Sequence, residues 1–367
     1  MSRIDDLIAE HCPDGVEFKR LGDIVRIKNG KDHKSLGDGE FPVYGSGGIM
    51  RYADTYAYNK PSVLIPRKGS LGNLFFVDVP FWTVDTIFYT EIDEAQVCPK
   101  YLYYFLTTVG LGEMNQAGGV PSQTQSVLNE LKIPIPCPDK PEKSLEIQAE
   151  IVRILDAFAE LTAELTAELT ARKRQYNYYR DQLLSFEEGE VEWRTLEAIT
   201  TSIASGRNKA RTTEGAFPVY GSTGLIGFTD KAAYSGDALL IARVGANAGR
   251  VNAVSGSFDV SDNTLIIRPI DAWNIRFAFH QLTHMNLNQY AVGGGQPLVT
   301  GGLLKSLLIP FPSFKEQERI AGILDKFDAL TNSLSEGLPL EITLRQKQYE
   351  YYRDLLLNFP KLESMEA

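Results

Sequence analysis

Two long stretches of the chain place apolar residues at the three- and four-residue spacing of an amphipathic helix. In residues 144–186 these positions are Ile147, Ile151, Ile154, Phe158, Leu161, Leu165, Leu169, Tyr176, Tyr179 and Leu183. The second stretch, residues 314–359, continues the pattern through Ile320, Ile323, Phe327 and Leu330. It also contains Gly337 and Pro339, so we expect a break near 337–339, with Pro339 in the first turn of the continuing helix. At about 1.5 Å per residue, the first helix would be roughly 60 Å long.

The segments before each predicted helix show a different pattern, with short runs rich in Val, Ile, Phe and Tyr that favour β-strands. Strands are expected at 62–65, 74–79 and 85–92, and again at 238–242, 250–254 and 263–270. Helices are expected at 100–108 and 275–287. Dense Gly and Pro separate these runs, which indicates tight connections. The pattern predicts domains of the mixed α+β class.

The two halves of the chain repeat each other. QYNYYRDQLLSF at 175–186 returns as QYEYYRDLLLNF at 348–359, identical at nine of twelve positions. Three shorter pairs are FPVYGSGG and FPVYGSTG at 41–48 and 217–224, LIPRKG and LIARVG at 64–69 and 240–245, and IPIP and IPFP at 133–136 and 309–312. We therefore predict a tandem duplication with four parts: a globular domain at 1–143, a central helix at 144–189, a second globular domain at 190–313, and a C-terminal helix at 314–367.

A smaller repeat lies inside the first predicted helix. The run LTAELTAELTA at 161–171 contains TAEL twice, at 162–165 and 166–169. Four residues add about 6 Å of length and about 40° of rotation to a helix. A slipped repeat on a solvated helix is the plain explanation. Between two duplicated domains, the repeat instead favours a ruler that sets their separation.

Composition changes this picture little. The chain has 367 residues, 43% of them hydrophobic, which fits two globular domains plus helices. It has no apolar run of 18 residues and no signal-peptide core, and its three cysteines are too few for a disulfide framework, so we expect a cytoplasmic protein. The net charge is −10, but the segments 146–189 and 314–367 carry −4 and −3 of it. The globular domains can therefore still present basic faces to phosphates, with modest affinity that a partner would supplement.

These phrases together resemble the specificity subunit of Type I restriction-modification enzymes. The resemblance rests on FPVYGSGG and FPVYGSTG, on IPIP and IPFP followed by EIQAEIVRILDAF and EQERIAGILDKF, on the two tyrosine-rich phrases, and on the TAEL repeat. It covers essentially the whole chain, and the TAEL and YYRD segments look most like one subgroup of the family.

The resemblance implies a non-catalytic subunit with two tandem target-recognition domains, each reading one half of a bipartite, asymmetric double-stranded DNA site. Two long helices packed as an antiparallel coiled coil would separate the domains in a pseudo-twofold arrangement. Two methyltransferase subunits and restriction (translocase/nuclease) subunits would complete the enzyme, with no membrane involved. The chain would need no cofactor, because S-adenosylmethionine, ATP and Mg²⁺ would belong to the partner subunits. The family also implies that the number of TAEL repeats sets the gap between half-sites.

We expect the DNA contacts on polar loops, because Arg, Lys, Asn, Gln, Ser and Tyr supply phosphate clamps and base readers. The first domain offers Lys31, Lys34, Tyr44, Ser46, Arg51, Arg67, Lys68, Asn73 and Gln123. The second offers Arg207, Lys209, Arg211, Tyr220, Ser222, Arg243, Asn247, Arg250 and Gln296. Positions shared by both copies suit phosphate binding or framework, and differing positions suit base readout. The glycine-rich segments at 118–125 and 293–300 could hold a phosphate through backbone amides, although for any one loop residue a solvated turn is equally plausible.

A second set of residues lies on the helices and is expected to form the spacer or bind partners. The set is Leu161, Leu165, Leu169, Tyr178, Tyr179, Arg180, Tyr351, Tyr352 and Arg353. Three tyrosines within four residues cannot all face one seam, because adjacent helical positions diverge by about 100°. We therefore expect Tyr176 and Tyr349 to pack, and at least one other tyrosine per helix to face a methyltransferase or a recognition domain.

Catalytic and metal-binding motifs are missing. The chain has no Asn-Pro-Pro-aromatic motif for adenine methylation and no GxxxxGK phosphate loop. His280 and His284 have helical spacing but lack the HExxH glutamate, so a structural or exposed role is favoured over zinc. A self-contained methyltransferase is thus disfavoured. The remaining alternative is a free-standing bivalent adaptor, or a DNA-binding protein outside a restriction system, and the acidic balance is its best support.

Overall fold

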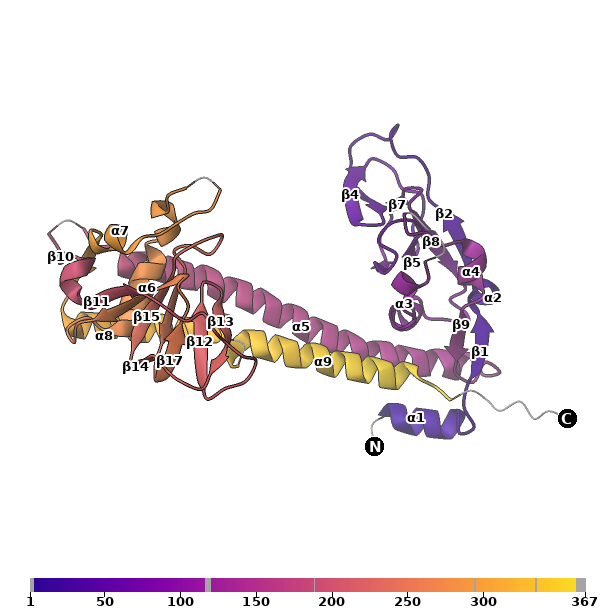
Figure 1. Ribbon diagram of the computed structural model, residues 1–367. Coiled ribbons are helices and arrows are strands. Elements are labelled where there is room, and N and C mark those ends of the chain that lie inside the picture. The colour runs from indigo at the N-terminus through magenta and orange to yellow at the C-terminus, as the bar shows by residue number, and fades with distance from the viewer. Residues whose placement is uncertain (1–2, 116–119, 188, 294, 334, 361–367) are drawn as a thin grey trace. The chain divides into compact units, whose positions relative to one another are not determined.

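The structure is a computed structural model that describes residues 3–115, 120–187, 189–293, 295–333 and 335–360 (Figure 1). The chain forms two compact units. Unit 1 comprises Met1–Glu164 and Thr343–Ala367, and unit 2 comprises Leu165–Ile342. The division passes through two helices, so each unit contains one globular domain and helical segments from both copies of the duplication. The domain limits expected at 143, 189 and 313 stay a prediction.

Unit 1 is built around a four-stranded antiparallel sheet with strand order β2-β8-β5-β6. The strands are β2 (Val25–Asn29), β5 (Ser62–Pro66), β6 (Phe75–Val77) and β8 (Ile87–Ile92). In β5, Val63 and Ile65 join the core cluster that includes α3 (Pro99–Thr108), while Leu64 packs in a separate cluster with Phe81. Both faces of this central strand are therefore buried, as its run of apolar residues predicts.

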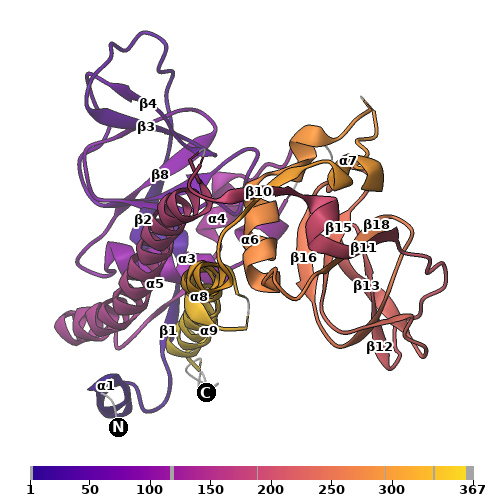
Figure 2. The same cartoon turned by 90° about the vertical axis from the view of Figure 1, so that its left-hand side faces the viewer.

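Smaller sheets flank this one. A three-stranded sheet has the order β4-β3-β7, and a two-stranded ribbon pairs β1 with β9. Their strands are β3 (Phe41–Gly45), β4 (Gly48–Ala53), β7 (Trp82–Thr83), β1 (Glu17–Arg20) and β9 (Lys132–Ile135). Within unit 1, β3 and β4 lie at one end and α1 (Arg3–His11) lies at the other (Figure 2). The ribbon pairs Glu17 with Ile135, so the first and last strands of the domain run side by side.

Unit 2 repeats this topology. Its sheets have the orders β11-β18-β15-β16 and β13-β12-β17-β14, and a ribbon pairs β10 with β19. The strands are β10 (Glu192–Thr195), β11 (Thr200–Ser205), β12 (Phe217–Gly221), β13 (Gly224–Thr229), β14 (Tyr234–Ser235), β15 (Ala238–Ala242), β16 (Val251–Val254), β17 (Ser257–Val260), β18 (Thr264–Pro269) and β19 (Leu308–Phe311). Like the β1–β9 ribbon, this ribbon pairs the ends of its domain, Glu192 with Phe311.

Short helices complete both domains. They are α2 (Leu21–Ile24), α4 (Gln125–Asn129), α6 (Ile275–His284) and α7 (Gly301–Lys305), with single 3₁₀ turns at Leu111–Glu113, Leu196–Ile199 and Leu287–Tyr290. All six predicted strands are present with small shifts of their ends. The helix expected to reach residue 287 is wrong at its C-terminus. It ends at His284, because Asn286 adopts a left-handed conformation with φ of 47° that ends the helix.

The predicted long helices are present with adjusted ends. The first is α5 (Pro141–Leu184), and the second is divided into α8 (Phe314–Asn332) and α9 (Gly337–Leu357). Pro339 lies in the first turn of α9, as expected. Gly337 has a φ of 73°, and a Cβ there would lie 2.4 Å from the carbonyl oxygen of Ala329. Only glycine therefore fits at this junction without backbone movement. No helix in the described parts of the chain is long and apolar enough to cross a membrane.

Within each unit, helical segments from the two copies pack against each other. In unit 1 the rings of Phe158 on α5 and Tyr352 on α9 stack with centroids 5.3 Å apart. In unit 2 the rings of Phe327 on α8 and Tyr179 on α5 stack at 5.8 Å. Phe158 and Phe327 are equivalent positions of the duplication, as are Tyr179 and Tyr352. Each unit thus pairs the phenylalanine of one copy with the tyrosine of the other.

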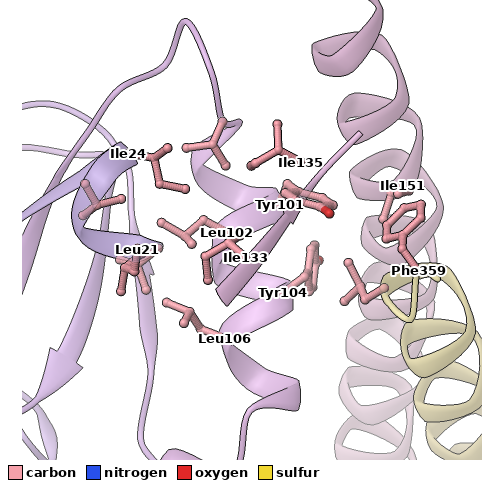
Figure 3. Close-up of a cluster of buried hydrophobic side chains, with 14 of the residues drawn as sticks. Leu21, Ile24, Tyr101, Leu102, Tyr104, Leu106, Ile133, Ile135, Ile151 and Phe359 are labelled. Carbon is pink, nitrogen blue, oxygen red and sulfur yellow. The ribbon is translucent and has the colours of Figure 1, made fainter. Parts of the chain in front are cut away.

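The core of unit 1 joins the domain to this helical pair. Tyr101 and Leu102 of α3 pack with Ile133 and Ile135 of the ribbon, and the same cluster includes Ile151 of α5 (Figure 3). Leu356, Leu357 and Phe359, at and just beyond the end of α9, complete it. Because Ile151 clusters with Phe359 while the later Phe158 meets the earlier Tyr352, α5 and α9 run antiparallel in unit 1. The expected coiled coil stays a prediction.

Candidate nucleic-acid interface

Backbone hydrogen bonds bring two of the predicted loops of unit 1 together. Gly69 N donates to Pro121 O at 2.8 Å, and Gln123 N donates to Arg67 O at 3.0 Å. Unit 2 repeats both bonds 176 residues later, with Gly245 N to Pro297 O at 3.0 Å and Val299 N to Arg243 O at 2.8 Å. The same loop scaffold is thus built twice. The segments expected to hold a phosphate lie beside it, although Gly118, Gly119 and Gly294 are outside the described residues, and in the second segment Thr300 already accepts the amide of Leu303.

The β3–β4 turn joins this loop cluster in unit 1. Ser46 N donates to Thr86 Oγ1 at 3.3 Å, and Ser46 O accepts from Asn73 Nδ2 at 3.3 Å. Arg67 N donates to Thr86 O at 2.8 Å, which connects the turn to the segment after β5. Ser46 and Arg67, which are distant in sequence, therefore share the partner Thr86, and Asn73 joins them through its bond to Ser46. No motif marked Thr86, because its role comes only from the folded arrangement.

Cationic side chains of the loops and of the framework differ in their partners. Among the described residues, no ion pair forms at Lys31, Lys34, Arg67, Lys68, Arg207, Lys209, Arg211, Arg243 or Arg250. By contrast, Lys100 and Arg276, where each domain meets the helices, bind Asp156 and Asp325 at 2.8 Å and 2.6 Å. Cations that form no ion pair remain available to phosphates. The loop cations are thus suited to DNA, and the framework cations to folding.

Two predicted contact residues have structural partners inside their domain. Arg51 lies on β4, and its guanidinium binds Asp38 at 2.6 Å and the carbonyl oxygens of Leu36 and Gly37 at 3.2 Å and 3.1 Å. Gln123 is only 2% exposed, because its Nε2 donates to Pro66 O at 2.6 Å. Its Oε1 has no partner among the described residues. Arg51 fixes the loop before β3, and Gln123 fixes the end of β5.

The expectation that Tyr44 and Tyr220 lie on loops is wrong. Both are strand residues, on β3 and β12, and their rings pack against phenylalanines. Tyr44 lies 5.8 Å from Phe75, and Tyr220 lies 6.1 Å from Phe258 in an edge-on arrangement. Burial raises the pKa of Tyr44. The proline and glycine of FPVYG are typical of turns, so the sequence did not predict strands there. Both tyrosines pack inside their domain and therefore belong to its framework.

The remaining predicted residues of unit 2 lie on polar connections. Ser222 is in the β12–β13 turn, and Asn247 and Arg250 lie between β15 and β16, where Arg250 N donates to Asn247 O at 2.9 Å. Gln296 is exposed. Lys209 and Arg211, also exposed, lie between β11 and β12. All the DNA contacts predicted for the second domain, except Tyr220, therefore lie in segments that connect its strands and helices.

A family model described as the Type I restriction modification DNA specificity domain matches residues 13–172 and 191–344, one match in each copy. The chain belongs to this family. The specificity subunit of the Escherichia coli Type I restriction enzyme EcoR124I/EcoR124II is 42% identical over 75% of this chain and 74% of that protein. A Haemophilus influenzae chain named as a Type I restriction enzyme specificity subunit is 30% identical over 94% and 96%.

The fold agrees with the family. The crystal structure of a Type I restriction-modification S subunit from M. genitalium covers 95% of this chain, with a TM-score of 0.65 and 18% identity. This match confirms the mixed α+β class. The chain is thus a specificity subunit, the non-catalytic DNA-recognition component of a Type I system. In the described parts of this specificity subunit, no group of three or more His, Cys, Asp or Glu could hold a metal ion.

The helix tyrosines of the specificity subunit divide into packed and exposed positions. Tyr176 lies 6.1 Å from Phe327, and Tyr349 lies 6.5 Å from Tyr104, so the expected packing of both is confirmed. Tyr178 and Tyr351, at equivalent positions, are 59% and 65% exposed. The predicted arginines lie over tyrosine rings: Arg180 is 5.7 Å from the ring of Tyr176, and Arg353 is 5.9 Å from that of Tyr349. Leu161, Leu165 and Leu169 are half-buried.

A polar cluster not found from the sequence links α6 to α8 in unit 2. Asp325 Oδ1 accepts from Arg276 Nη2 at 2.6 Å and contacts His280 Nε2 at 2.7 Å. An ionised carboxylate only accepts, so His280 Nε2 carries the proton. Burial lowers the pKa of His280, with Asp325 opposing in part. Burial alone would raise the pKa of Asp325, but the bonds from Arg276 and His280 outweigh it and lower that pKa. His280 is thus a structural histidine, as expected.

Proposed function

We propose that this specificity subunit recognises a bipartite, asymmetric double-stranded DNA site, with each recognition domain reading one half-site. One observation carries the proposal: the loop scaffold occurs twice with the same backbone bonds, but with different polar side chains at many positions. The bonds Gln123 N to Arg67 O and Val299 N to Arg243 O show the shared scaffold. Two readers of identical sequence would need identical loops. Different loops on one scaffold instead suit two different half-sites.

The residues divide by role on this basis. Lys31 and Arg207 are equivalent, exposed and without an ion pair among the described residues, so we assign them to phosphates. Lys34, Lys68, Lys209 and Arg211 are cationic in one copy only, and Asn73 is replaced by Arg in the other copy. These differing positions supply the sequence-dependent contacts. Affinity is expected to fall with salt in proportion to the phosphates that the cations contact.

The partner surface is proposed to lie on the exposed helix residues. Tyr178 and Tyr351 are large, exposed and equivalent by the duplication, which fits two copies of one partner. We therefore assign them to two methyltransferase subunits, with restriction subunits joining that core. S-adenosylmethionine, ATP and Mg²⁺ are proposed to act in those partners, in the cytoplasm. The cofactor assignment rests on the absence of binding motifs from the sequence and on the family resemblance.

The TAEL repeat is proposed to set the gap between the half-sites. It occupies α5 around residues 162–169, and its leucines Leu161, Leu165 and Leu169 recur every fourth residue. Deleting residues 166–169 shortens a helix by about 6 Å and turns its end by about 40°. The methylated motif of such a variant is expected to change its gap and keep both half-sites. Altered half-sites would contradict the ruler.

The function is tested by co-expressing the chain with its methyltransferase subunit and mapping methylated adenines across the host genome. A gapped motif with two unlike halves is the expected result. Absence of any gapped, two-part motif would overturn the proposal. It would instead favour an adaptor outside a restriction system, for which the net charge of −10 is the supporting observation.

A further inference from the structure

Unit 2 contains a polar cavity within its candidate DNA interface. The cavity has a volume of about 390 Å³ and is lined by Asn208, Lys209, Arg211, Ser222, Ser261 and Asp262, among others. This volume falls within the roughly 300–1,000 Å³ range of sites that hold small ligands. Apart from Gly221 and Ile226, all the residues that line the cavity have polar or charged side chains. The cavity is thus large enough for a nucleobase and is chemically suited to a hydrogen-bonding group.

The orientation of the Asn208 amide is fixed by a buried carboxylate. Asn208 Nδ2 donates to Asp259 Oδ2 at 2.6 Å, and Asp259 Oδ1 accepts from Val260 N at 2.8 Å. A carboxylate only accepts, so the nitrogen of the amide must face Asp259 and the oxygen must face away. Backbone bonds hold the residue in place, because Asn208 N donates to Val260 O at 2.9 Å. Asn208 Oδ1 is thereby presented as an acceptor.

Two polar atoms of the cavity lack partners. Asn208 Oδ1 and Ser261 Oγ are both buried without a hydrogen bond among the described residues, and Ser261 is only 4% exposed. Unsatisfied buried groups are costly and rare, so a pair of them in one cavity points to a ligand that satisfies both. They are shielded in the free chain. Lys209 and Arg211 also line the cavity, and both are exposed.

The chemistry of the cavity favours a base over a phosphate. Asn208 Oδ1 and the carboxylate of Asp262 are acceptors, and a carboxylate beside the site repels a phosphate. Among groups on the base edges of the major groove, only the exocyclic amines of adenine and cytosine donate hydrogen bonds. Lys209 and Arg211 are suited to the flanking phosphates. We propose that this cavity reads one adenine or cytosine of the second half-site, with Asn208 Oδ1 accepting from the exocyclic amine and Ser261 Oγ bonding the same base.

The first domain cannot make the same contact. The strand registers and backbone bonds of the two domains make Asp32, Trp82 and Val84 the positions equivalent to Asn208, Asp259 and Ser261. The amide and the carboxylate that orients it are therefore both absent from copy one. This difference fits a reader of the second half-site and does not fit a shared framework. The assignment rests on the proposed function, in which each domain reads its own half-site.

The first test maps the methylated motif for the full chain with its methyltransferase, comparing wild type with Asn208→Ala and Ser261→Ala. We expect an unchanged first half-site and gap, and relaxed discrimination at one A or C position of the second half-site. The matched control is Asn274→Ala in the same domain. Asn274 Oδ1 caps α6 by accepting from Arg276 N and Phe277 N at 3.0 Å each, so this variant loses stability without touching the cavity. Its motif is expected to stay unchanged.

A second test uses the assembled wild-type methyltransferase complex and covers the case in which a cavity variant fails to fold. Each adenine or cytosine of the second half-site is replaced in turn by purine or 2-pyrimidinone, which lack the exocyclic amine. Binding is expected to weaken about tenfold at one position. In Asn208→Ala, if folded, that position should lose its effect. The cavity assignment is overturned if no position responds, or if both variants keep the wild-type motif. Lack of any gapped motif in wild type would instead overturn the proposed function.

Discussion

The junctions between domain and helices in the two units share a geometry but differ in chemistry. In unit 1, Asp156 binds Lys100 at 2.8 Å and accepts from the hydroxyl of Tyr104. In unit 2, the equivalent Asp325 binds Arg276 and His280. An aspartate on the long helix thus anchors the domain helix in both copies. The duplication has kept the position of the carboxylate while its donors changed.

The difference teaches where the scaffold tolerates change. A phenol in one copy and an imidazole in the other both donate to a carboxylate, so either maintains the junction. The stacked pairs Phe158–Tyr352 and Phe327–Tyr179 show no such change. Apolar packing between copies is therefore held more strictly than polar anchoring. The recognition loops, where Asn208 and Asp32 are equivalent, differ most in their chemistry.

The largest expected effect is a loss of stability, and it tests whether the apolar cores between domain and long helices are equivalent in the two units. Leu155 on α5 and Leu324 on α8 are equivalent positions, and both are fully buried at 0% exposure. Replacing either by Ala removes buried methyl groups and leaves a cavity, which costs about 3 kcal/mol of unfolding free energy. Chemical denaturation of each variant measures the loss. Similar losses support equivalent cores, and a loss below about 1 kcal/mol at one site only would break the comparison.

A smaller effect is expected from removing the anchoring carboxylate. Asp325→Ala leaves His280, which is only 1% exposed, without an acceptor, and is expected to cost about 2 kcal/mol. Asp156→Ala should cost less, about 1 kcal/mol, because Lys100 is 37% exposed and can turn into solvent, so that the main loss is one hydrogen bond, from the neutral, buried hydroxyl of Tyr104. Thermal unfolding of both variants shows which of them loses more stability. A larger loss of stability in Asp156→Ala would contradict the claim that Asp325 is the stronger anchor.

The shared loop cations are expected to contribute equally to DNA binding. Lys31→Ala and Arg207→Ala should each weaken binding by about 1 kcal/mol on any DNA sequence and reduce the salt dependence of affinity by about one phosphate contact. Arg153→Ala is the control, because Arg153 is exposed on α5 and already binds Glu150 at 2.7 Å. Binding titrations at several salt concentrations provide the measurement. Sequence-dependent losses would assign these residues to bases.

The smallest effect is a dependence of stability on pH, which is expected from the junction of unit 2 because only that junction contains a histidine. The pKa of His280 lies below its ordinary value of 6.5 because of burial. The unfolded chain therefore binds more protons, so the contribution of His280 to stability is present above about pH 6.5 and is lost as pH falls below it. His280→Gln keeps a donor to Asp325 without titrating, and should flatten the decrease in melting temperature below pH 6.5.

The control for this titration is His284, which is more exposed at 24% and whose pKa burial also lowers. His284→Gln should flatten the profile less than His280→Gln. Asp325, whose pKa is lowered from 3.8, loses its contribution only at more acidic pH, outside this window. A profile that His280→Gln leaves unchanged would contradict the assignment.

Periodic patterns predicted the helices well, because burial on one helix face imposes a regular spacing on the sequence. The break before α9 also followed from local residues, since Gly337 and Pro339 each restrict the backbone. Strands β3 and β12 were missed because the proline and glycine of FPVYG are typical of turns. Local sequence patterns therefore predicted helices and their breaks, but not every strand.

The candidate site was less accessible from the sequence. Loop cations such as Lys31 and Arg207 were identified from residue type alone, which needs no knowledge of the fold. The roles of Asn208 and Asp325 depend on partners 51 and 45 or more residues away, Asp259 and His280. The fold determines which donor meets which acceptor when the two residues are this far apart in the sequence. The long-range hydrogen bonds therefore had to be read from the structure.

The central claim is that one scaffold reads two different half-sites, and an exchange of domains tests it most directly. Both domains begin and end on equivalent ribbon pairs, Glu17 with Ile135 and Glu192 with Phe311. A chain in which residues 17–135 also replace 192–311 keeps these ribbons and both long helices. Methylated adenines are mapped after co-expression with the methyltransferase. The account predicts a gapped motif made of two copies of the first half-site, and persistence of the original second half-site would contradict it.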